Sequence, residues 1–396
     1  MEIYCDNAAT TSLDLEVLDT MIPYLANHYG NPSSSHGIGR KAREAVEESR
    51  LKIASLLNVS ENDIFFTSGA TEANNLALSG AIKTYDIKNV ITSKLEHKAV
   101  LQTLGQYSQQ NDLESDFVKL DSKGNIDFEQ LEWLLKNNQQ TLVSLMHGNN
   151  EIGNLTDIKK VGEICKKYDA IFHSDTTQTI GKYRFDVKKL YIDYIVGSSH
   201  KFHGPKGVGF IYINKYRKIQ PHIFGGAQER GTRGGTENVA GIVGMAKALE
   251  IAYRNLEEYQ NYVAFLKSKM IMALQDLFGD EITFNGESDS IGNSLPNILN
   301  VAFPNLKKGG VLVNRLDALG IAVSGGSACS NLTNNGSHVL KTLNRNLDKD
   351  SVRFSFCKYN TPAEIDLIIK AIVDIYDQDI FVRKLNQKKL SALIYA

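Results

Sequence analysis

Lys201 stands at the end of an apolar segment, where its amine could take part in unusual chemistry. Residues 194–196 before it and residues 208–213 after it are apolar runs typical of buried β-strands. The segment "SSHK" places two serines and a histidine directly before the lysine. A lysine amine in a desolvated, partly cationic pocket loses proton affinity and becomes a nucleophile toward carbonyls. A lone lysine is most often a surface charge, so the hypothesis of a Schiff-base lysine depends on its neighbours.

The segment "TSGATEANN" has the features of a phosphate-binding turn. Gly69 permits a tight turn, and Ala70 and Thr71 then fall at the N-terminus of a helix. The free backbone N–H groups and the positive end of the helix dipole favour a phosphate there. An ordinary helix cap would give the same pattern. Ser198 and His200, just before Lys201, could supply further donors to the same phosphate.

Asp175 and Gln178 follow another apolar run, in the segment "FHSDTTQ". A carboxylate at the end of a buried strand needs a cationic partner or strong donors. It could be a salt-bridge partner, or it could bind a protonated aromatic nitrogen, and a phenolic oxygen would suit Gln178. Taken with Lys201 and the phosphate turn, these side chains match pyridoxal 5′-phosphate: the lysine on its aldehyde, the aspartate on its ring nitrogen and the helix on its phosphate.

These side chains can meet only if the strands of one sheet position them. From about residue 60 to residue 215, short apolar runs alternate with helical patterns, which predicts βαβ units and a largely parallel sheet covered by helices. Such sheets bind their ligands beyond the carboxyl ends of the strands. Five predicted strands end there, followed in turn by the hydroxyl-rich turn, His97, Asn149 with Asn150, Asp175 with Gln178, and Lys201.

The rest of the chain has a mixed pattern. A long helical stretch from about residue 239 to residue 274 is followed by short strands and by the helical segment "TPAEIDLIIKAIVDIY". We therefore expect an α/β fold of two domains. A large, mostly parallel-sheet domain would span residues 13–255, and a smaller α+β domain would be formed by residues 1–12 together with residues 256–396.

Composition narrows the function further. The chain has 396 residues, 42% of them apolar, and a net charge of −1, so bulk electrostatics gives no case for nucleic acid or an anionic membrane as partner. Four cysteines make no disulfide framework at this length, and each is expected to be a free thiol. The N-terminal segment lacks the features of a secretory signal or a transit peptide, and no run reaches membrane-spanning length, so a cytoplasmic protein is expected.

The motifs, taken in order, resemble those of the cysteine desulfurases of the class V aminotransferase superfamily. The resemblance covers almost the whole chain, in the segments "YCDNAATT", "NPSSSHGIGR", "FTSGATEANN", "EHKAV", "HGNNEIG", "SSHKFHGPKGVG", "RGGTEN", "SGGSACS" and "VRFSF". It implies the type I (aspartate aminotransferase-like) fold of the enzymes that use pyridoxal 5′-phosphate. It also implies a homodimer, with L-cysteine as substrate and a sulfur-acceptor protein as partner.

Roles for individual residues follow from this resemblance. Lys201 would be the Schiff-base lysine, and His97 would stack on the pyridine ring and take part in proton transfer. Asp175 would hold the ring nitrogen, while Gln178 and Asn150 would contact the cofactor near its phenolic oxygen. The phosphate would be bound by Ala70, Thr71, Ser198 and His200, and by Thr236 of the partner subunit. The substrate carboxylate would be bound by Arg353, whose guanidinium suits a bidentate contact, and by Asn150.

Cys329, in "SGGSACSNLTNNGS", would be the nucleophile of the resembling enzymes. Glycine, serine and asparagine dominate this segment, which predicts an exposed loop. Its thiolate would attack the sulfur of L-cysteine, leaving alanine and a persulfide that an acceptor thiol collects, for iron–sulfur clusters or tRNA thiolation. Cys5, Cys165 and Cys357 lie in apolar or helical segments and fit inert buried thiols instead.

Three alternatives are weighed against this interpretation. His173-x-Asp175 and His200-x-x-His203 could ligate zinc in a metallohydrolase, but that leaves Lys201 unexplained, and no metal is expected. The second alternative is another enzyme of the same fold, such as a selenocysteine lyase or an aminotransferase. The presence of Cys329 in its loop argues against transamination. A catalytically silent sulfur-binding partner is the third, but the chain lacks none of the reactive residues named above.

Overall fold

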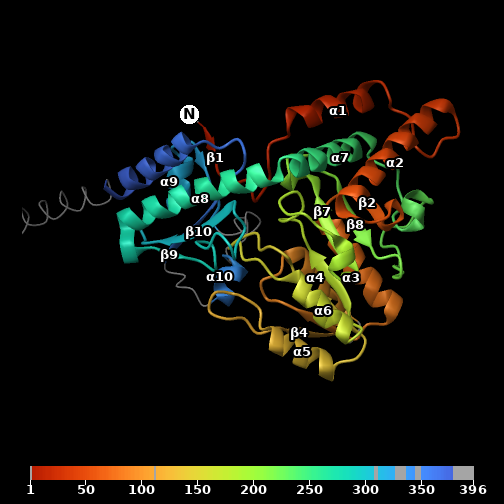
Figure 1. The fold of residues 1–396 in the computed structure, drawn as a ribbon, viewed down its shortest axis with the longest axis horizontal. Helices are drawn as coiled ribbons and strands as arrows, with labels where there is room; N and C mark the ends of the chain where they lie inside the picture. The colour runs from red at the N-terminus through yellow and green to blue at the C-terminus, as the bar shows by residue number, and fades with distance from the viewer. Residues whose placement is uncertain (1, 111–112, 307–310, 326–335, 344–348, 378–396) are drawn as a thin grey trace, which may run out of the picture. The chain divides into compact units, whose positions relative to one another are not determined.

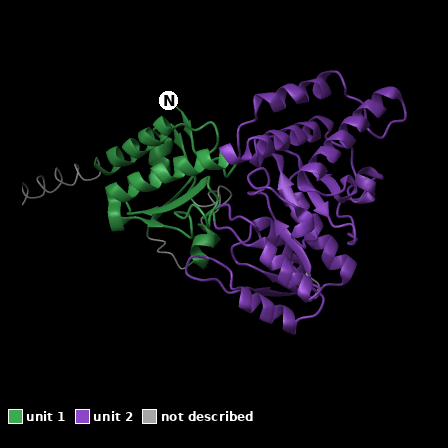
Figure 2. Ribbon diagram, in the orientation of Figure 1, with its two compact units in different colours: residues 1–9, 151–153, 259–396 green, residues 10–150, 154–258 purple. Residues whose placement is uncertain are grey.

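The computed structural model describes residues 2–110, 113–306, 311–325, 336–343 and 349–377. They form two compact units, each with a hydrophobic core of its own (Figure 2). The larger unit comprises residues 10–150 and 154–258, and the smaller unit comprises residues 1–9, residues 151–153 and the chain from residue 259. The domain boundaries expected from the sequence, at 12/13 and 255/256, stay a prediction.

The larger unit is built on a seven-stranded sheet with the strand order β2-β8-β7-β6-β5-β3-β4 (Figure 1). Neighbouring strands from β4 to β7 are parallel, and β8 is antiparallel to both β7 and β2. The predicted, largely parallel sheet is therefore confirmed. The strands are β2 (Ile64–Thr67), β3 (Asn89–Thr92), β4 (Glu114–Phe117), β5 (Thr141–Ser144), β6 (Ile171–Asp175), β7 (Tyr194–Ser198) and β8 (Gly209–Ile213).

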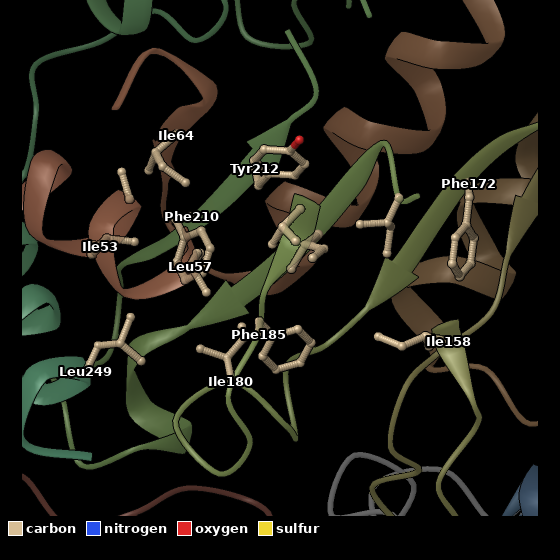
Figure 3. Close-up of a cluster of buried hydrophobic side chains, with 14 of the residues drawn as sticks. Ile53, Leu57, Ile64, Ile158, Phe172, Ile180, Phe185, Phe210, Tyr212 and Leu249 are labelled. Carbon is tan, nitrogen blue, oxygen red and sulfur yellow. The ribbon is translucent and has the colours of Figure 1, made fainter. Parts of the chain in front are cut away.

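Strand side chains alternate between two cores, one on each face of this sheet. Phe66, Val143 and Phe172 belong to a core shared with helices α2 (Gly37–Leu57), α5 (Phe128–Asn137), α6 (Ile158–Lys167) and α7 (Val239–Arg254), part of which Figure 3 shows. Their neighbours Phe65 and Leu142 belong to the core shared with α3 (Ala70–Tyr85) and α4 (Lys98–Gln110). Helix α1 (Leu15–Ala26) packs on α7.

Two elements differ from the sequence expectation. Strand β4 was not anticipated, because its sequence "ESDF" has no apolar run and its residues are only partly buried or exposed. The long helix expected over residues 239–274 is two helices, α7 and α8 (Leu256–Phe278), since Asn255 caps the end of α7 in a non-helical conformation. None of the helices in the described ranges is long and apolar enough to cross a membrane.

The smaller unit has mixed α and β structure. Its antiparallel sheet has the order β12-β10-β9, and β1 pairs in parallel with β11. The strands are β1 (Ile3–Tyr4), β9 (Thr283–Phe284), β10 (Ile298–Phe303), β11 (Ile321–Ala322) and β12 (Asp350–Ser355). They share a core with α8, with α9 (Leu312–Asp317) and with a helix within residues 362–377, and the unit also contains α10 (His338–Thr342).

Residues 151–153 belong to the smaller unit although the chain on either side of them belongs to the larger one. The Asn300 side chain donates a hydrogen bond of 2.9 Å to the backbone carbonyl of Glu151, and the Leu295 backbone donates one of 2.7 Å to Gly153. Gly153 has φ +75°, a left-handed conformation that side chains other than glycine rarely adopt.

A buried ion pair anchors the segment that leads to Thr236. Arg50 of α2 donates to both carboxylate oxygens of Glu229 at 2.8 and 2.9 Å, and the Phe66 backbone donates to the same carboxylate at 2.7 Å. The side chains of Arg50 and Glu229 are 4% and 2% exposed. Glu229 and Arg230 both have positive φ, +46° and +55°, so the buried bonds hold a strained turn.

Removing the Glu229 carboxylate should therefore destabilise the larger unit strongly. Glu229→Ala leaves the buried guanidinium with Glu47, which is half exposed, as its acidic partner, and we expect the free energy of unfolding to fall by about 3–5 kcal/mol. Glu250→Ala is the matched control, because Glu250 pairs with Lys52 at the surface, where such pairs contribute about 0–1 kcal/mol. Urea unfolding of both variants measures the difference. Equal losses in the two variants would contradict this assignment.

Candidate active site

The carboxyl ends of five strands, β2, β3, β5, β6 and β7, lie at one edge of the sheet in the larger unit, because these strands run in the same direction. The segments that follow them carry most of the side chains predicted to bind a cofactor. Each of these side chains therefore lies at this edge because it follows the end of a buried strand or belongs to the first turn of a helix.

Helix α3 begins at this edge without a side-chain cap. Gly69 is its N-cap residue, makes no side-chain hydrogen bond to the helix, and has φ +155°. Ala70 and Thr71 are the first residues of the helix. Ser198, at the end of β7, lies against this turn, since a Cβ added to Gly69 would be 3.6 Å from the Ser198 hydroxyl oxygen. The open N–H groups of α3 and a buried hydroxyl thus come together in an arrangement suited to an anion.

Asp175 ends β6 and is 6% exposed. Its Oδ2 accepts a 2.7 Å hydrogen bond from Nδ2 of Asn74 on α3, and its Oδ1 accepts a 2.9 Å bond from the backbone of Thr177. Donors on both oxygens stabilise the ionised form of a buried carboxylate. A carboxylate held in this way can accept a further hydrogen bond from a protonated aromatic nitrogen.

The amide of Asn74 is itself oriented by a buried histidine. His173 lies 3.0 Å through Nε2 from Asn74 Oδ1 and 2.9 Å through Nδ1 from the Ser144 hydroxyl. Because Asn74 Nδ2 donates to Asp175, its Oδ1 faces His173, which must donate to it from Nε2. Burial lowers the pKa of His173, and Asp175 opposes that shift. A neutral His173 therefore accepts a hydrogen bond from the Ser144 hydroxyl at Nδ1 and donates one to Asn74 from Nε2. Asn74 in turn donates to Asp175, so each hydrogen bond in this series points toward the carboxylate.

Lys201 lies in a short 3₁₀ turn, Ser199–Lys201, directly after β7. The preceding His200 is held by Thr10, whose hydroxyl is 3.1 Å from Nδ1, and by the backbone and hydroxyl of Thr11, which both donate to its carbonyl at 2.9 Å. Burial, and next the charge of Lys201, lower the pKa of His200 to about 4. His200 is consequently neutral at pH 7. One of its ring nitrogens then carries a proton and can donate a hydrogen bond, while the other can accept one.

His97 and Asn150 follow β3 and β5. His97 Nδ1 accepts the Ala99 backbone N–H at 3.1 Å at the start of α4, which leaves its proton on Nε2. Asn150 lies in a turn closed by a 2.9 Å bond from the Asn149 backbone to the carbonyl of residue 154. The Asn149 side chain donates to the carbonyl of Leu95 at 2.9 Å, so this turn and the segment that leads to His97 are held together.

Gln178 and Thr177 lie in the turn that follows Asp175. Gln178 is 4% exposed, and the Thr177 hydroxyl is buried with no hydrogen-bond partner in the part of the chain that the structure describes. An unpaired hydroxyl beside a buried carboxylate is typical of a position where a ligand supplies the missing partner. With Lys201, Asp175 and the open end of α3 at the same edge, these residues fit a phosphorylated pyridine aldehyde.

The remaining predicted residues lie elsewhere or outside the described ranges. Thr236 is exposed, in the loop that the Arg50–Glu229 pair anchors. Arg353, on β12 of the smaller unit, is 1% exposed and donates to Asp6 at 2.7 Å, and its backbone pairs with Ser324. Cys329 falls outside the described residues. The roles predicted for all of these residues stay predictions.

The other three cysteines are buried free thiols, as predicted. Burial raises the pKa of the Cys5, Cys165 and Cys357 thiols, so they are poor nucleophiles. Both ring nitrogens of His173 have hydrogen-bond partners, which argues against the zinc interpretation of His173-x-Asp175. No group of three or more potential metal ligands occurs among the described residues.

Sequence reasoning missed several residues that the geometry places at this edge. Asn74 could have been found, because it is a polar residue on the buried, otherwise apolar face of α3. His173 is two residues before Asp175 and so faces the same side of β6, a signal that was interpreted only as a metal ligand. No local signal in the sequence pointed to Thr10.

Comparison with known proteins agrees with this geometry. The family model of the class-V aminotransferases matches residues 3–368. The cysteine desulfurase IscS of Dictyoglomus turgidum is 39% identical over 382 residues, which is 95% of each chain. A putative cysteine desulfurase, IscS 1 of Bacillus subtilis, is 39% identical over 94% of this chain and 98% of its own.

Solved structures give the same answer. A NifS-like protein superposes with a TM-score of 0.87 at 41% identity, covering 95% of this chain and 100% of its own. A NifS-like protein from Rickettsia africae has a TM-score of 0.83 at 31% identity, over 95% of this chain and 100% of its own. The resemblance seen in the motifs and the predicted type I fold are both confirmed. The chain belongs to the cysteine desulfurases of the class-V aminotransferase family, whose members use pyridoxal 5′-phosphate.

Proposed function

We propose that this protein is a pyridoxal 5′-phosphate-dependent cysteine desulfurase that converts L-cysteine to L-alanine and passes the sulfur to an acceptor thiol. The observation that carries the proposal is the meeting of Lys201, Asp175 and the open end of α3 at one edge of the sheet. Each group alone has an ordinary structural explanation. A lysine, a donor-stabilised carboxylate and an anion site at the same edge match the aldehyde, ring nitrogen and phosphate of one cofactor.

The bound cofactor would supply an electron sink for the bond-breaking at the substrate. Lys201 would hold it covalently, and the N–H groups of Ala70 and Thr71, with Ser198 and His200, would bind its phosphate. Asp175, whose two oxygens accept hydrogen bonds from Asn74 and from the Thr177 backbone, would hold the ring nitrogen protonated.

His97 and Arg353 would act on the substrate. His97 carries its proton on Nε2, because Nδ1 accepts the Ala99 N–H, so Nε2 is the atom that can donate a proton or a hydrogen bond. The Arg353 guanidinium would bind the substrate carboxylate with Asn150. Asp6 holds one end of that guanidinium at 2.7 Å and so restricts its rotation.

Cys329 would carry the sulfur. Its thiolate would attack the sulfur of the substrate and form a sulfur–sulfur bond. The carbon–sulfur bond would break with its electron pair left on the carbon, which takes up a proton, so the sulfur stays on Cys329 as a persulfide and the carbon skeleton leaves as alanine. An acceptor protein then takes the sulfur for iron–sulfur cluster assembly or for tRNA thiolation. The burial of the other three cysteines supports this choice of nucleophile.

The protein would act as a homodimer in which Thr236 completes the phosphate site of the partner subunit. Thr236 is exposed on a glycine-flanked loop, where a second subunit can reach it. Leu15, Leu18, Ile22 and Leu25 are exposed at helical spacing along α1, and an apolar stripe of this kind supports burial against another subunit. The cytoplasmic location expected from the N-terminal sequence stays a prediction.

Lys201→Ala should lose covalent attachment of the cofactor. Borohydride reduction of the wild-type protein loaded with pyridoxal 5′-phosphate should fix the cofactor to the chain, and mass spectrometry should find the adduct on Lys201. Lys206→Ala, an exposed lysine in the same segment, is the control and should give the adduct as the wild type does. A reducible adduct that persists in Lys201→Ala refutes the assignment.

Cys329→Ala should keep the visible chromophore but form no persulfide from L-cysteine. Because the cofactor residues of the larger unit are untouched, cofactor binding should match the wild type, while alanine and sulfide release should fall by about 100-fold or more. Cys165→Ala, a buried thiol, should retain persulfide formation. Sulfide release from Cys329→Ala at the wild-type rate would rule out this nucleophile.

A further inference from the structure

Lys182 is a buried lysine beside the candidate cofactor site that has no role so far. Only 3% of the residue is exposed. Its Nζ donates to the backbone carbonyl of Gln178 at 2.9 Å and lies 3.5 Å from the side-chain oxygen of the same residue. Gln178 is the residue expected to contact the phenolic oxygen of the cofactor. Lys182 thus touches Gln178 at two atoms.

The backbone brings this lysine close to Lys201. Gly181, with φ +79°, packs so tightly that an added Cβ would lie 2.7 Å from the Cβ of Phe202, the residue that follows Lys201. The two amines are near enough that the charge of Lys201 acts on Lys182. Burial, and next that charge, lower the pKa of Lys182 to about 7. Lys182, which is a cation only when its amine is protonated, therefore lies just behind the lysine that would bind the cofactor.

An ammonium group can donate hydrogen bonds but cannot accept one. The end of the Gln178 amide that faces Lys182 must then be its oxygen, and the NH₂ group must point the other way. A glutamine amide left free can turn either end toward a ligand with almost the same shape. The protonated form of Lys182 behind Gln178 removes that ambiguity.

We propose that Lys182 is a positioning residue that fixes the Gln178 amide with its NH₂ group toward the phenolic oxygen of the cofactor. The inference rests on the proposed function, since it concerns the cofactor of that site. It assigns Lys182 no contact with the cofactor or the substrate. The amide N–H, held in one orientation, favours the ionised form of the phenolic oxygen, and so does the nearby positive charge.

The test is cofactor binding by purified apo-protein, followed through the visible absorption of added pyridoxal 5′-phosphate. Lys182→Met should raise the dissociation constant by about three- to tenfold, the effect of one lost hydrogen bond. It should also shift the pH midpoint of the bound chromophore upward, because the donor and the charge that favour the ionised oxygen are lost. Lys182→Arg, which keeps a cationic donor, should restore at least part of both properties.

Lys267→Met is the matched control. Lys267 is also fully buried, with a pKa lowered to about 7, but it lies in the smaller unit and donates to Ser294 and Leu295. Its replacement removes a buried lysine of the same kind and tests for general destabilisation. We expect it to leave the dissociation constant and the chromophore midpoint within twofold and 0.2 pH units of the wild type, roughly the scatter of a structurally neutral change.

A double-mutant cycle with Gln178→Met shows whether Lys182 acts through the glutamine. The effect of Lys182→Met should be clearly smaller when Gln178 is already replaced. Equal effects in both backgrounds, or wild-type binding and titration in Lys182→Met, would overturn the proposal. If Lys182→Met does not fold, the neutral variant Lys182→Gln is measured with the same expected outcomes. A wild-type protein that binds no cofactor would instead defeat the proposed function itself.

Discussion

A buried carboxylate, that of Asp175, is the constraint on which the rest of the site depends. Its two oxygens are satisfied by Asn74 and by the Thr177 backbone, and burial without such donors would be costly. Asn74 lies on α3 four residues after Ala70, which is about one helical turn, or roughly 5–6 Å along the axis. One hydrogen bond thus joins the carboxylate to the helix whose N-terminus forms the anion site. The ring end and the phosphate end of the candidate site are set by the same element.

Three imidazoles near this edge, those of His147, His173 and His200, favour the neutral form at neutral pH. Burial lowers the pKa of His147 to about 4, His200 has a similar value for the same main reason, and the pKa of His173 is also lowered. Positive charge near the site therefore comes from Lys201, and from Lys182 when its amine is protonated. A neutral histidine donates a hydrogen bond from one ring nitrogen and accepts one at the other, so it fixes the orientation of its two neighbours. The lysines supply the positive electrostatic potential.

The sequence predicted those parts of the site that depend on local pattern. Alternating apolar runs located six of the seven strands of the large sheet, and the polar residues after them marked the edge at which Asp175 and Lys201 lie. Strand β4 was not predicted, because the composition of "ESDF" does not favour a strand. This segment lies at the edge of the sheet and is a strand because it pairs with β3. The break between α7 and α8 depends on a single capping residue, Asn255, in an otherwise helical pattern.

The missing parts of the site depend on contacts between distant segments. Asn74 and Asp175 are 101 residues apart, and Ser144 and His173 are 29 apart, so no spacing rule relates them. The pair Arg353–Asp6 joins residues 347 apart in the smaller unit. Such partners are chosen by strand order and register, which the sequence pattern does not determine. Family motifs drew attention to some of these residues, but they did not say which neighbour each one holds.

The smaller unit is built from three separate segments of the chain, one of them residues 151–153, and this division has a consequence for biogenesis. The smaller unit is assembled from a leading piece, this short middle piece and the chain from residue 259, and strand β1 finds its partner β11 more than 300 residues later. While the ribosome is still making the protein, the larger unit can mature as soon as its last helix emerges. The leading strand must wait unpaired until nearly the whole polypeptide exists, and contacts this remote in sequence form slowly. Newly made chains therefore pass through a stage with one finished core and one that is still open.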